Sequence, residues 1–157
     1  MSAWRDASPS DDEGIVELCV ALYREDPGER PIDAGGIRRT LAAFRERPMR
    51  GRALALEVDG RLCGYALLCR YWSNELGGEL SCIDEIYVSP RARGRGYGRG
   101  LIERLIREGE SPTSGVVALA LEVTPGNERA RTFYEGLGFR GGNRALRRLL
   151  SGPTPEE

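Results

Sequence analysis

Apolar residues recur every three to four positions in four segments of the chain, the spacing that places them on one helix face. The first helix begins at Ser10 or Asp11, either of which can cap it, and ends near Asp26. The second begins after Asp33, which can cap it, the third follows a glycine-rich run, and the fourth spans residues 127–137. We therefore expect four amphipathic helices around a common core.

Other segments are apolar over short stretches and end in turn signals, as β-strands do. Asp59-Gly60 separates two of them and predicts a tight hairpin turn. We expect a closing strand at Phe139 and over Ala145–Leu150. The other expected strands are Trp4–Ala7, Arg52–Val58, Leu62–Trp72, Leu80–Val88 and Gly115–Val123.

These elements follow one another in the order βααβββαβαβ(β), which is typical of an α/β fold with a mixed central sheet. The length of 157 residues suits one domain. We expect that domain to cover residues 1–150, and residues 151–157 to form a mobile, polar tail.

Composition narrows the chemistry that the chain can carry out. Histidine is absent, which excludes an imidazole base, a Ser-His-Asp triad and a histidine metal site. The four cysteines form no CxxC pair, so we expect no metal. A net charge of −1 gives no reason to expect a nucleic acid partner. The sequence contains neither the apolar core of a signal peptide nor an apolar run long enough to span a membrane. We therefore expect a cytoplasmic protein without membrane contact.

The segment Val88-Ser-Pro-Arg-Ala-Arg-Gly-Arg-Gly-Tyr-Gly joins a strand to a helix. Gly94, Gly96 and Gly98 allow the backbone to approach a ligand closely. Unpaired amides at the start of the next helix favour an anion such as a pyrophosphate, and Arg93 and Arg95 add positive charge. A flexible turn with solvated arginines is an alternative, and Arg-Gly alternation also occurs in RNA-binding segments.

Two motifs together resemble the GNAT (Gcn5-related N-acetyltransferase) superfamily. IDEIYVSPRARGRGYGRGLIERL is similar to its acetyl-CoA turn, Arg/Gln-x-x-Gly-x-Gly/Ala, at Arg93, Gly96 and Gly98. LEVTPGNERARTFYEGLGF is similar to its second motif, which matches Asn127, Ala130, Tyr134, Gly138 and Phe139. The element order resembles the GNAT fold along nearly the whole chain. IDEIYV also has a weak likeness to spermidine/spermine-type small-amine acetyltransferases.

The resemblance implies an N-acetyltransferase in which an amine attacks acetyl-CoA directly while both are bound. The pantetheine arm would pair with the backbone of Ile86 and Val88. Tyr134 would protonate the departing sulfur, although it also suits the core face of a helix. Asn127 is a helix cap, a cofactor ligand or both. The expected cofactor residues are Ile86, Tyr87, Val88, Arg93, Gly94, Arg95, Gly96, Tyr97, Gly98, Arg99, Asn127 and Tyr134.

Carboxylates are the remaining candidates for the base. Asp84 and Glu85 are adjacent in a strand, so they face opposite sides unless a bulge intervenes, and a salt bridge to arginine is the structural alternative. We rank Asp84 first as base, Glu85 second and Glu122 third. For the acceptor we expect a small cationic amine. Its expected binding residues are Glu25, Asp26, Trp72, Asp84, Glu85 and Glu122.

Four points stay open from the sequence. The acceptor can instead be a protein N-terminus, and the chain can be a module that binds acetyl-CoA without transferring the acetyl group. The acyl-chain preference is not readable. The oligomeric state is open too, and a homodimer is compatible with the sequence.

Overall fold

The computed structural model describes residues 1–141 and 146–148. The chain divides into two units, residues 1–122 and 123–157, and each is described by itself. The expected tail, residues 151–157, lies outside the described residues. Within the described residues, each helix is too short or too polar to span a bilayer.

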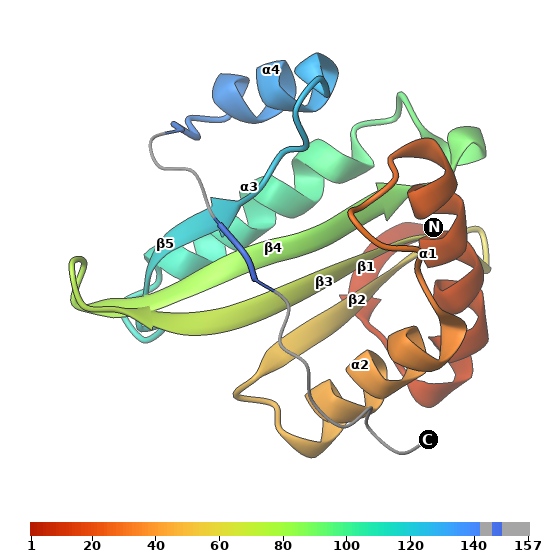
Figure 1. The fold of residues 1–157 in the computed structure, drawn as a ribbon, viewed down its shortest axis with the longest axis horizontal. Helices are drawn as coiled ribbons and strands as arrows, with labels where there is room; N and C mark the ends of the chain where they lie inside the picture. The colour runs from red at the N-terminus through yellow and green to blue at the C-terminus, as the bar shows by residue number, and fades with distance from the viewer. Residues whose placement is uncertain (142–145, 149–157) are drawn as a thin grey trace. The chain divides into compact units, whose positions relative to one another are not determined.

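A mixed β-sheet forms the centre of the first unit (Figure 1). Its strand order is β1-β2-β3-β4-β5. The strands from β1 to β4 are antiparallel to one another in turn, and β5 runs parallel to β4. This agrees with the predicted fold class. The strands are β1 (Ser2–Asp6), β2 (Gly51–Val58), β3 (Arg61–Ser73), β4 (Gly78–Val88) and β5 (Val116–Leu121).

The β2–β3 hairpin confirms the predicted Asp59-Gly60 turn. Both residues have positive φ, 50° for Asp59 and 73° for Gly60. Such angles give the hairpin a turn whose twist matches that of its strands.

Four α-helices occur in the described residues, as predicted from the apolar spacing. Two short 3-10 helices, η1 (Pro9–Asp11) and η2 (Pro90–Ala92), accompany them. The α-helices are α1 (Asp12–Glu25), α2 (Ala34–Glu46), α3 (Tyr97–Glu110) and α4 (Glu128–Gly136).

Two of the predicted helix caps are confirmed, and one works differently. The side chain of Asp33 accepts hydrogen bonds from the Gly35 and Gly36 amides, and that of Asn127 accepts one from the Ala130 amide. Asp11 precedes α1 without capping it. Its carboxylate instead accepts hydrogen bonds from Ser8 and from the Arg5 guanidinium, because η1 intervenes between β1 and α1. Asp11 and Arg5 both lie in the first unit.

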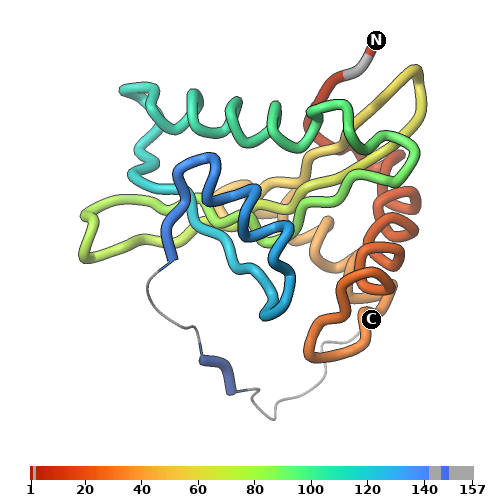
Figure 2. The backbone as a smooth tube through the Cα atoms, turned by 90° about the horizontal axis from the view of Figure 1, so that it is seen from above, coloured from red at the N-terminus to blue at the C-terminus, as the bar shows by residue number. Residues whose placement is uncertain are grey.

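The two faces of the sheet carry different helices. Successive strand residues point to opposite faces. Leu67 belongs to the core cluster with Ile15 of α1 and Leu41 of α2. Leu68 lines a cavity together with Leu105 of α3. Helices α1 and α2 therefore cover one face, and α3 covers the other (Figure 2).

The start of α3 is tied to the N-terminal strand. The Trp4 indole Nε1 donates a hydrogen bond of 2.9 Å to the Tyr97 carbonyl, and Arg104 donates one of 2.9 Å to the Trp4 carbonyl. These contacts fix the first and second turns of α3 against β1.

In the second unit, the prediction of a closing strand at Phe139 is wrong. The Phe139 amide donates to the Tyr134 carbonyl at 3.1 Å, so this residue belongs to the turn that ends α4. Gly138 makes that turn with a φ of 93°. Residues 146–148 are not in a strand either, and the rest of the segment Ala145–Leu150 lies outside the described residues.

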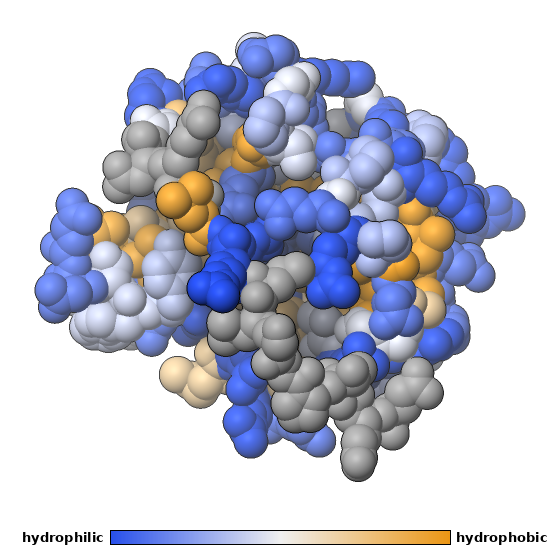
Figure 3. Space-filling model, in the orientation of Figure 1, coloured by the Kyte–Doolittle hydropathy of each residue, from blue (hydrophilic) through white to orange (hydrophobic). Residues whose placement is uncertain are grey.

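The face of the molecule shown in Figure 3 is mostly hydrophilic, with apolar side chains in small areas. Large apolar residues that are exposed include Trp72, with 64% of its surface accessible, and Tyr71, with 50%. Both lie at the end of β3, so they do not contribute to the buried core.

Candidate active site

Strands β4 and β5 part halfway along β4. Their pairing ends at Ile83 and Leu121, whereas β4 continues to Val88. The Ser89 amide donates to the Cys63 carbonyl of β3, so alternate residues before it point to the opposite edge. The backbone N–H and C=O groups of Ile86 and Val88 thus point away from β3, toward the edge of β4 that is no longer paired with β5. This edge is where the sequence predicts a pantetheine arm.

A β-bulge lies at the point where the two strands part. Leu67 is paired with Glu85 and Leu68 with Ile83, which leaves Asp84 as an extra residue in β4. Cross-strand partners share a face, so Glu85 points with Leu67 toward α1, and Ile83 points with Leu68 toward α3. The simple alternation of a strand therefore does not hold here, so the opposite faces expected for Asp84 and Glu85 in a regular strand cannot be assumed.

The Glu85 carboxylate is held by neutral donors. Tyr23 Oη donates to Oε2 at 2.6 Å, and Tyr65 Oη donates to Oε1 at 2.8 Å. Cys19 Sγ lies 3.5 Å from Oε1. Among the described residues, the partners of Glu85 are therefore two phenols and a thiol rather than the arginine that was the alternative. None of these three partners is among the site residues expected from the sequence.

Burial and the nearby carboxylate keep these donors protonated. Burial, followed by the influence of Glu85, raises the pKa of Tyr23 and of Tyr65 above the usual value for a phenol. Burial also raises the pKa of Cys19 to about 12. All three groups therefore carry their protons at neutral pH and can donate to Glu85.

Asp84 and Glu122 are exposed, in contrast to the half-buried Glu85. Burial raises the pKa of the Cys82 thiol, and the negative charges of Asp84 and Glu122 add to the shift. The two carboxylates are thus near enough to Cys82 to act on it electrostatically. The structure brings Asp84, Glu85 and Glu122, the three candidate bases, to the region where β4 and β5 separate.

The glycine-rich turn has the backbone that an anion site needs. Gly94 and Gly96 have positive φ, 75° and 79°, and Gly96 is the N-cap of α3. None of the backbone amides of residues 94–98 donates a hydrogen bond within the described chain. A Cβ added at Gly94, Gly96 or Gly98 would meet no atom within 4 Å, so the turn faces open space.

Arg93 is engaged with the protein itself. Its guanidinium donates to Glu25 at 2.6 Å and to the Val88 carbonyl at 2.8 Å, and it lies 5.2 Å from the centre of the Tyr87 ring. Tyr87 Oη also donates to Glu25 at 2.8 Å. Partial burial by itself would raise the pKa of Glu25, but hydrogen bonds from Arg93 and Tyr87 hold that pKa below its usual value. The end of α1 is thereby bridged to the start of the turn.

The predicted acceptor residues do not all come together. Glu25 and Asp26 lie at the end of α1, and Glu25 is bound to Arg93. Trp72 is paired with Glu79, five positions before Asp84. At about 3.3 Å per residue, this is some 17 Å from the bulge. The structure therefore separates Trp72 from the other predicted residues of the first unit.

In the second unit, Tyr134 lies in an aromatic cluster. Its ring contacts Phe133 and Phe139 edge-on, with centroids 5.1 Å and 5.7 Å away. Burial raises the pKa of Tyr134, which keeps the phenol protonated at neutral pH. Asn127 caps α4, as described above. Tyr134 as an acid and Asn127 as a cofactor ligand stay predictions.

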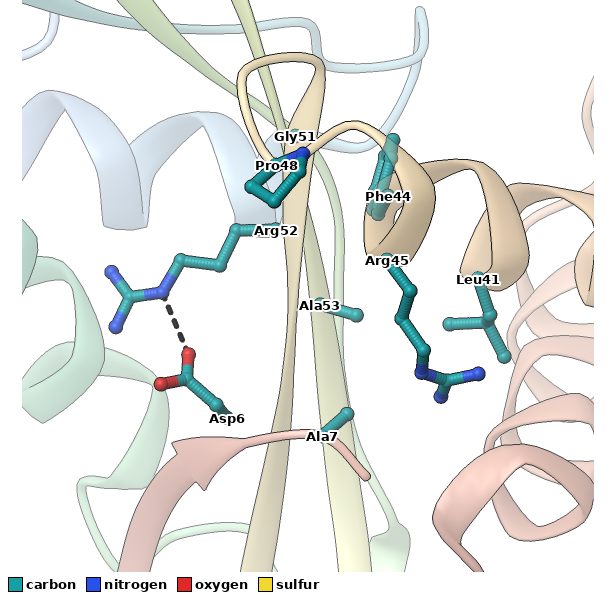
Figure 4. Close-up of a pocket in the computed structure, with 9 residues that line it drawn as sticks. All are labelled: Asp6, Ala7, Leu41, Phe44, Arg45, Pro48, Gly51, Arg52 and Ala53. Atoms are coloured by element: carbon teal, nitrogen blue, oxygen red, sulfur yellow. Dashed lines mark hydrogen bonds and ion pairs between the residues drawn. The ribbon is translucent and has the colours of Figure 1, made fainter. Parts of the chain in front are cut away.

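Two cavities of the first unit lie elsewhere. One of about 190 Å³ is lined by residues of β1, α2 and β2, and Figure 4 shows the Asp6–Arg52 ion pair at its side. A larger one, of about 440 Å³, lies on the α3 face. Neither is lined by a residue that the sequence assigns to the cofactor or the acceptor.

Comparison with known proteins agrees with both motifs. A ribosomal protein bS18-alanine N-acetyltransferase from Salmonella typhimurium is 38% identical over 86 residues, which are 55% of this chain and 53% of that protein. An L-2,4-diaminobutyric acid acetyltransferase from Nocardia farcinica is 28% identical over 138 residues, 87% of this chain and 68% of that protein. The chain spans about half or less of the length of the two curated relatives that it matches at 38% identity.

A solved structure, that of a possible acetyltransferase from Clostridium difficile 630, has the same fold. Its TM-score is 0.83 at 18% identity, covering 96% of this chain and 98% of that one. The model of the acetyltransferase (GNAT) family matches residues 16–139, which include the glycine-rich turn and the second motif. The chain therefore belongs to the GNAT family of acetyltransferases.

Proposed function

We propose that this chain transfers an acetyl group from acetyl-CoA to a primary amine. The observation that carries the proposal is the parting of β4 from β5 beside the glycine-rich turn. One feature offers a free strand edge and the other offers free amides, and they are joined by only a few residues, from Val88 to Gly96. An extended chain that ends in a diphosphate fits this pair of features, and the GNAT family generally uses acetyl-CoA.

The chain's own groups support a binding mode for such a ligand. Amides of residues 94–98 can donate to the diphosphate, aided by the positive end of α3. Arg95 is exposed and can add charge, whereas Arg93 orders the turn through Glu25 and Val88. The backbone of Ile86 and Val88 can pair with the amide groups of the pantetheine arm. When bound, acetyl-CoA supplies a thioester carbonyl that a neutral amine can attack.

The acceptor has to lose a proton before it can react, and carboxylates are the available bases. We favour Glu85 over Asp84 because its two oxygens are fixed by Tyr23 and Tyr65, and a base works best from a fixed position. Asp84 and Glu122 then serve to attract a cationic acceptor. Tyr134 is proposed to return a proton to the departing sulfur, and its protonated state at neutral pH suits this role.

The acceptor is proposed to be a small cationic amine. The Nocardia relative is named for a diamino acid, and carboxylates gather where β4 and β5 part. Glu25 contributes less than the sequence suggests, since Arg93 and Tyr87 already bind it. A protein N-terminus is the second candidate, because the Salmonella relative is named for acetylation of a ribosomal protein's alanine.

Two measurements test the proposal. Acetyl-CoA should raise the melting temperature, because a ligand that binds the native state alone stabilises it. Release of CoA thiol is then followed with spermidine, L-2,4-diaminobutyrate and a peptide that begins with alanine. A higher kcat/KM for either small amine supports the first candidate, and a higher value for the peptide supports the second. Binding of acetyl-CoA without release for any amine would favour a non-catalytic binding module.

A further inference from the structure

The two phenols on Glu85 suggest a role beyond packing. A carboxylate that is half-buried needs hydrogen-bond donors, and an arginine would supply them together with a neutralising charge. All 23 basic residues of this chain are arginines, yet the donors to Glu85 are Tyr23, Tyr65 and the Cys19 thiol. Within the part of the chain that the structure describes, these neutral groups orient the carboxylate without neutralising its charge.

The two phenols come from different surroundings. Tyr65 has no exposed surface and belongs to the core between β3 and α1. Tyr23 is half-buried and lies two residues before the end of α1. One oxygen of Glu85 is thus bound from the rigid sheet and the other from a helix end, and the two bonds together fix the plane of the carboxylate.

The loop after α1 contacts the more exposed of these phenols. A Cβ at Gly28 would lie 3.0 Å from Cε1 of the Tyr23 ring and 3.6 Å from Cδ1. Gly28 has no positive φ, so its small size matters here for the space that it leaves to the ring. Alanine at this position would require the ring to shift by a few tenths of an ångström, which would disturb the 2.6 Å hydrogen bond from its hydroxyl to Glu85.

We propose that Tyr23 and Tyr65 are positioning residues that hold Glu85 ready to receive the proton of the acceptor's ammonium group. The inference rests on the proposed acetyltransferase function. In this step the N–H bond of the ammonium breaks, its electron pair stays on nitrogen, and the proton moves to Glu85, directly or through a water molecule. The neutral amine then reacts, and the proton later passes to solvent. Gly28 belongs to the same arrangement, because it leaves room for the Tyr23 ring.

The main test is Tyr23→Phe, which keeps the ring and removes one donor. We expect kcat for the best amine of the screen to fall about tenfold, since a hydrogen bond to a charged group contributes roughly that factor or more. The KM for acetyl-CoA should stay unchanged. Tyr71→Phe, which alters an exposed tyrosine at the end of β3, is the matched control.

A second variant tests the same contact without touching a tyrosine. Gly28→Ala should lower kcat in the same direction, whereas Gly109→Ala should not, since its added Cβ would lie 3.8 Å from the nearest atom. The double variant Gly28→Ala/Tyr23→Phe should be no slower than Tyr23→Phe alone, because both changes act on the same hydrogen bond. Gly28→Ala also keeps the inference testable if Tyr23→Phe fails to fold.

A readout independent of acetyl-CoA comes from the tyrosines themselves. After burial, the influence of Glu85 contributes to the raised pKa of Tyr23 and Tyr65. In Glu85→Gln, tyrosine absorbance near 295 nm should therefore rise at lower pH than in the original protein, over the range in which circular dichroism shows both folded.

The outcomes distinguish a failure of the positioning role from a failure of the proposed acetyltransferase function. If the unaltered protein releases CoA and Tyr23→Phe matches it in kcat, the positioning role is wrong while the acetyltransferase function stands. If the unaltered protein releases no CoA with any amine, the proposed function fails and the inference fails with it. If both Tyr23→Phe and Gly28→Ala lower kcat while the KM for acetyl-CoA stays unchanged, and the controls do not, the inference is supported.

Discussion

Substitution of Gly96 tests the proposed cofactor turn most directly. This residue is the N-cap of α3, with φ 79° and ψ 11°, a left-handed conformation that disfavours any residue with a Cβ. The added Cβ would meet no atom within 4 Å, so sterics elsewhere contribute nothing. The cost of Gly96→Ala is therefore the backbone term alone, about 1–2 kcal/mol. For a chain of this size, each kcal/mol lowers the melting temperature by about 2–4 °C.

The matched control is Gly100→Ala, one turn further along α3. Its φ is not positive and its added Cβ also meets open space, so alanine should raise the stability there by up to about 1 kcal/mol. Differential scanning fluorimetry with and without acetyl-CoA measures both effects at once. Gly96→Glu should in addition abolish the stabilisation by acetyl-CoA, because it places a carboxylate beside the proposed diphosphate site. Full stabilisation of Gly96→Glu by acetyl-CoA would refute the assignment of this turn, and an unchanged apo melting temperature for Gly96→Ala would refute the estimate of strain.

Two further changes probe other parts of the chain. Hydrogen bonds from Arg5 lower the pKa of Asp11 from its usual 3.8 to about 2, so Asp11→Asn should lower the free energy of unfolding at pH 7 by about 1–2 kcal/mol after allowance for the exposure of Arg5. The folded-state pKa is the lower one, so the stabilisation is complete above pH 3.8 and lost as pH falls toward 2; urea titrations that give the same difference at pH 7 and pH 2 would contradict this. Tyr134→Phe should keep acetyl-CoA binding but lower kcat roughly 10²-fold or more, as the loss of a general acid does. An unchanged single-turnover rate would remove Tyr134 from that role.

Local rules predicted much of the fold. The Asp59-Gly60 turn and the Asp33 and Asn127 caps depend on residues within a few positions of one another, and all three are confirmed. The helices follow from apolar spacing, which is also a local property. Asp11 departs from its expected role because its partner, Arg5, lies on β1 beyond an intervening 3-10 helix.

The details of the candidate site depend on contacts between distant parts of the chain. Glu85 is bound by Tyr23, which lies 62 residues earlier, and Arg93 is bound by Glu25, 68 residues earlier. No periodicity within one element indicates such pairs. The spacing of Cys19 and Tyr23, four residues apart on α1, does place both on one helix face, and this was the signal available in the sequence.

The bulge in β4 has a consequence for how related chains can differ in length. A residue inserted into or removed from a regular strand reverses the face of everything on one side of the change. Asp84 is already an extra residue in the pairing of β4 with β3, so its removal would leave Ile83 and Glu85 on the faces that they now occupy. Position 84 is therefore the place in β4 where a one-residue gap is compatible with an unchanged core. Such a gap would delete one carboxylate from the candidate site and keep the sheet.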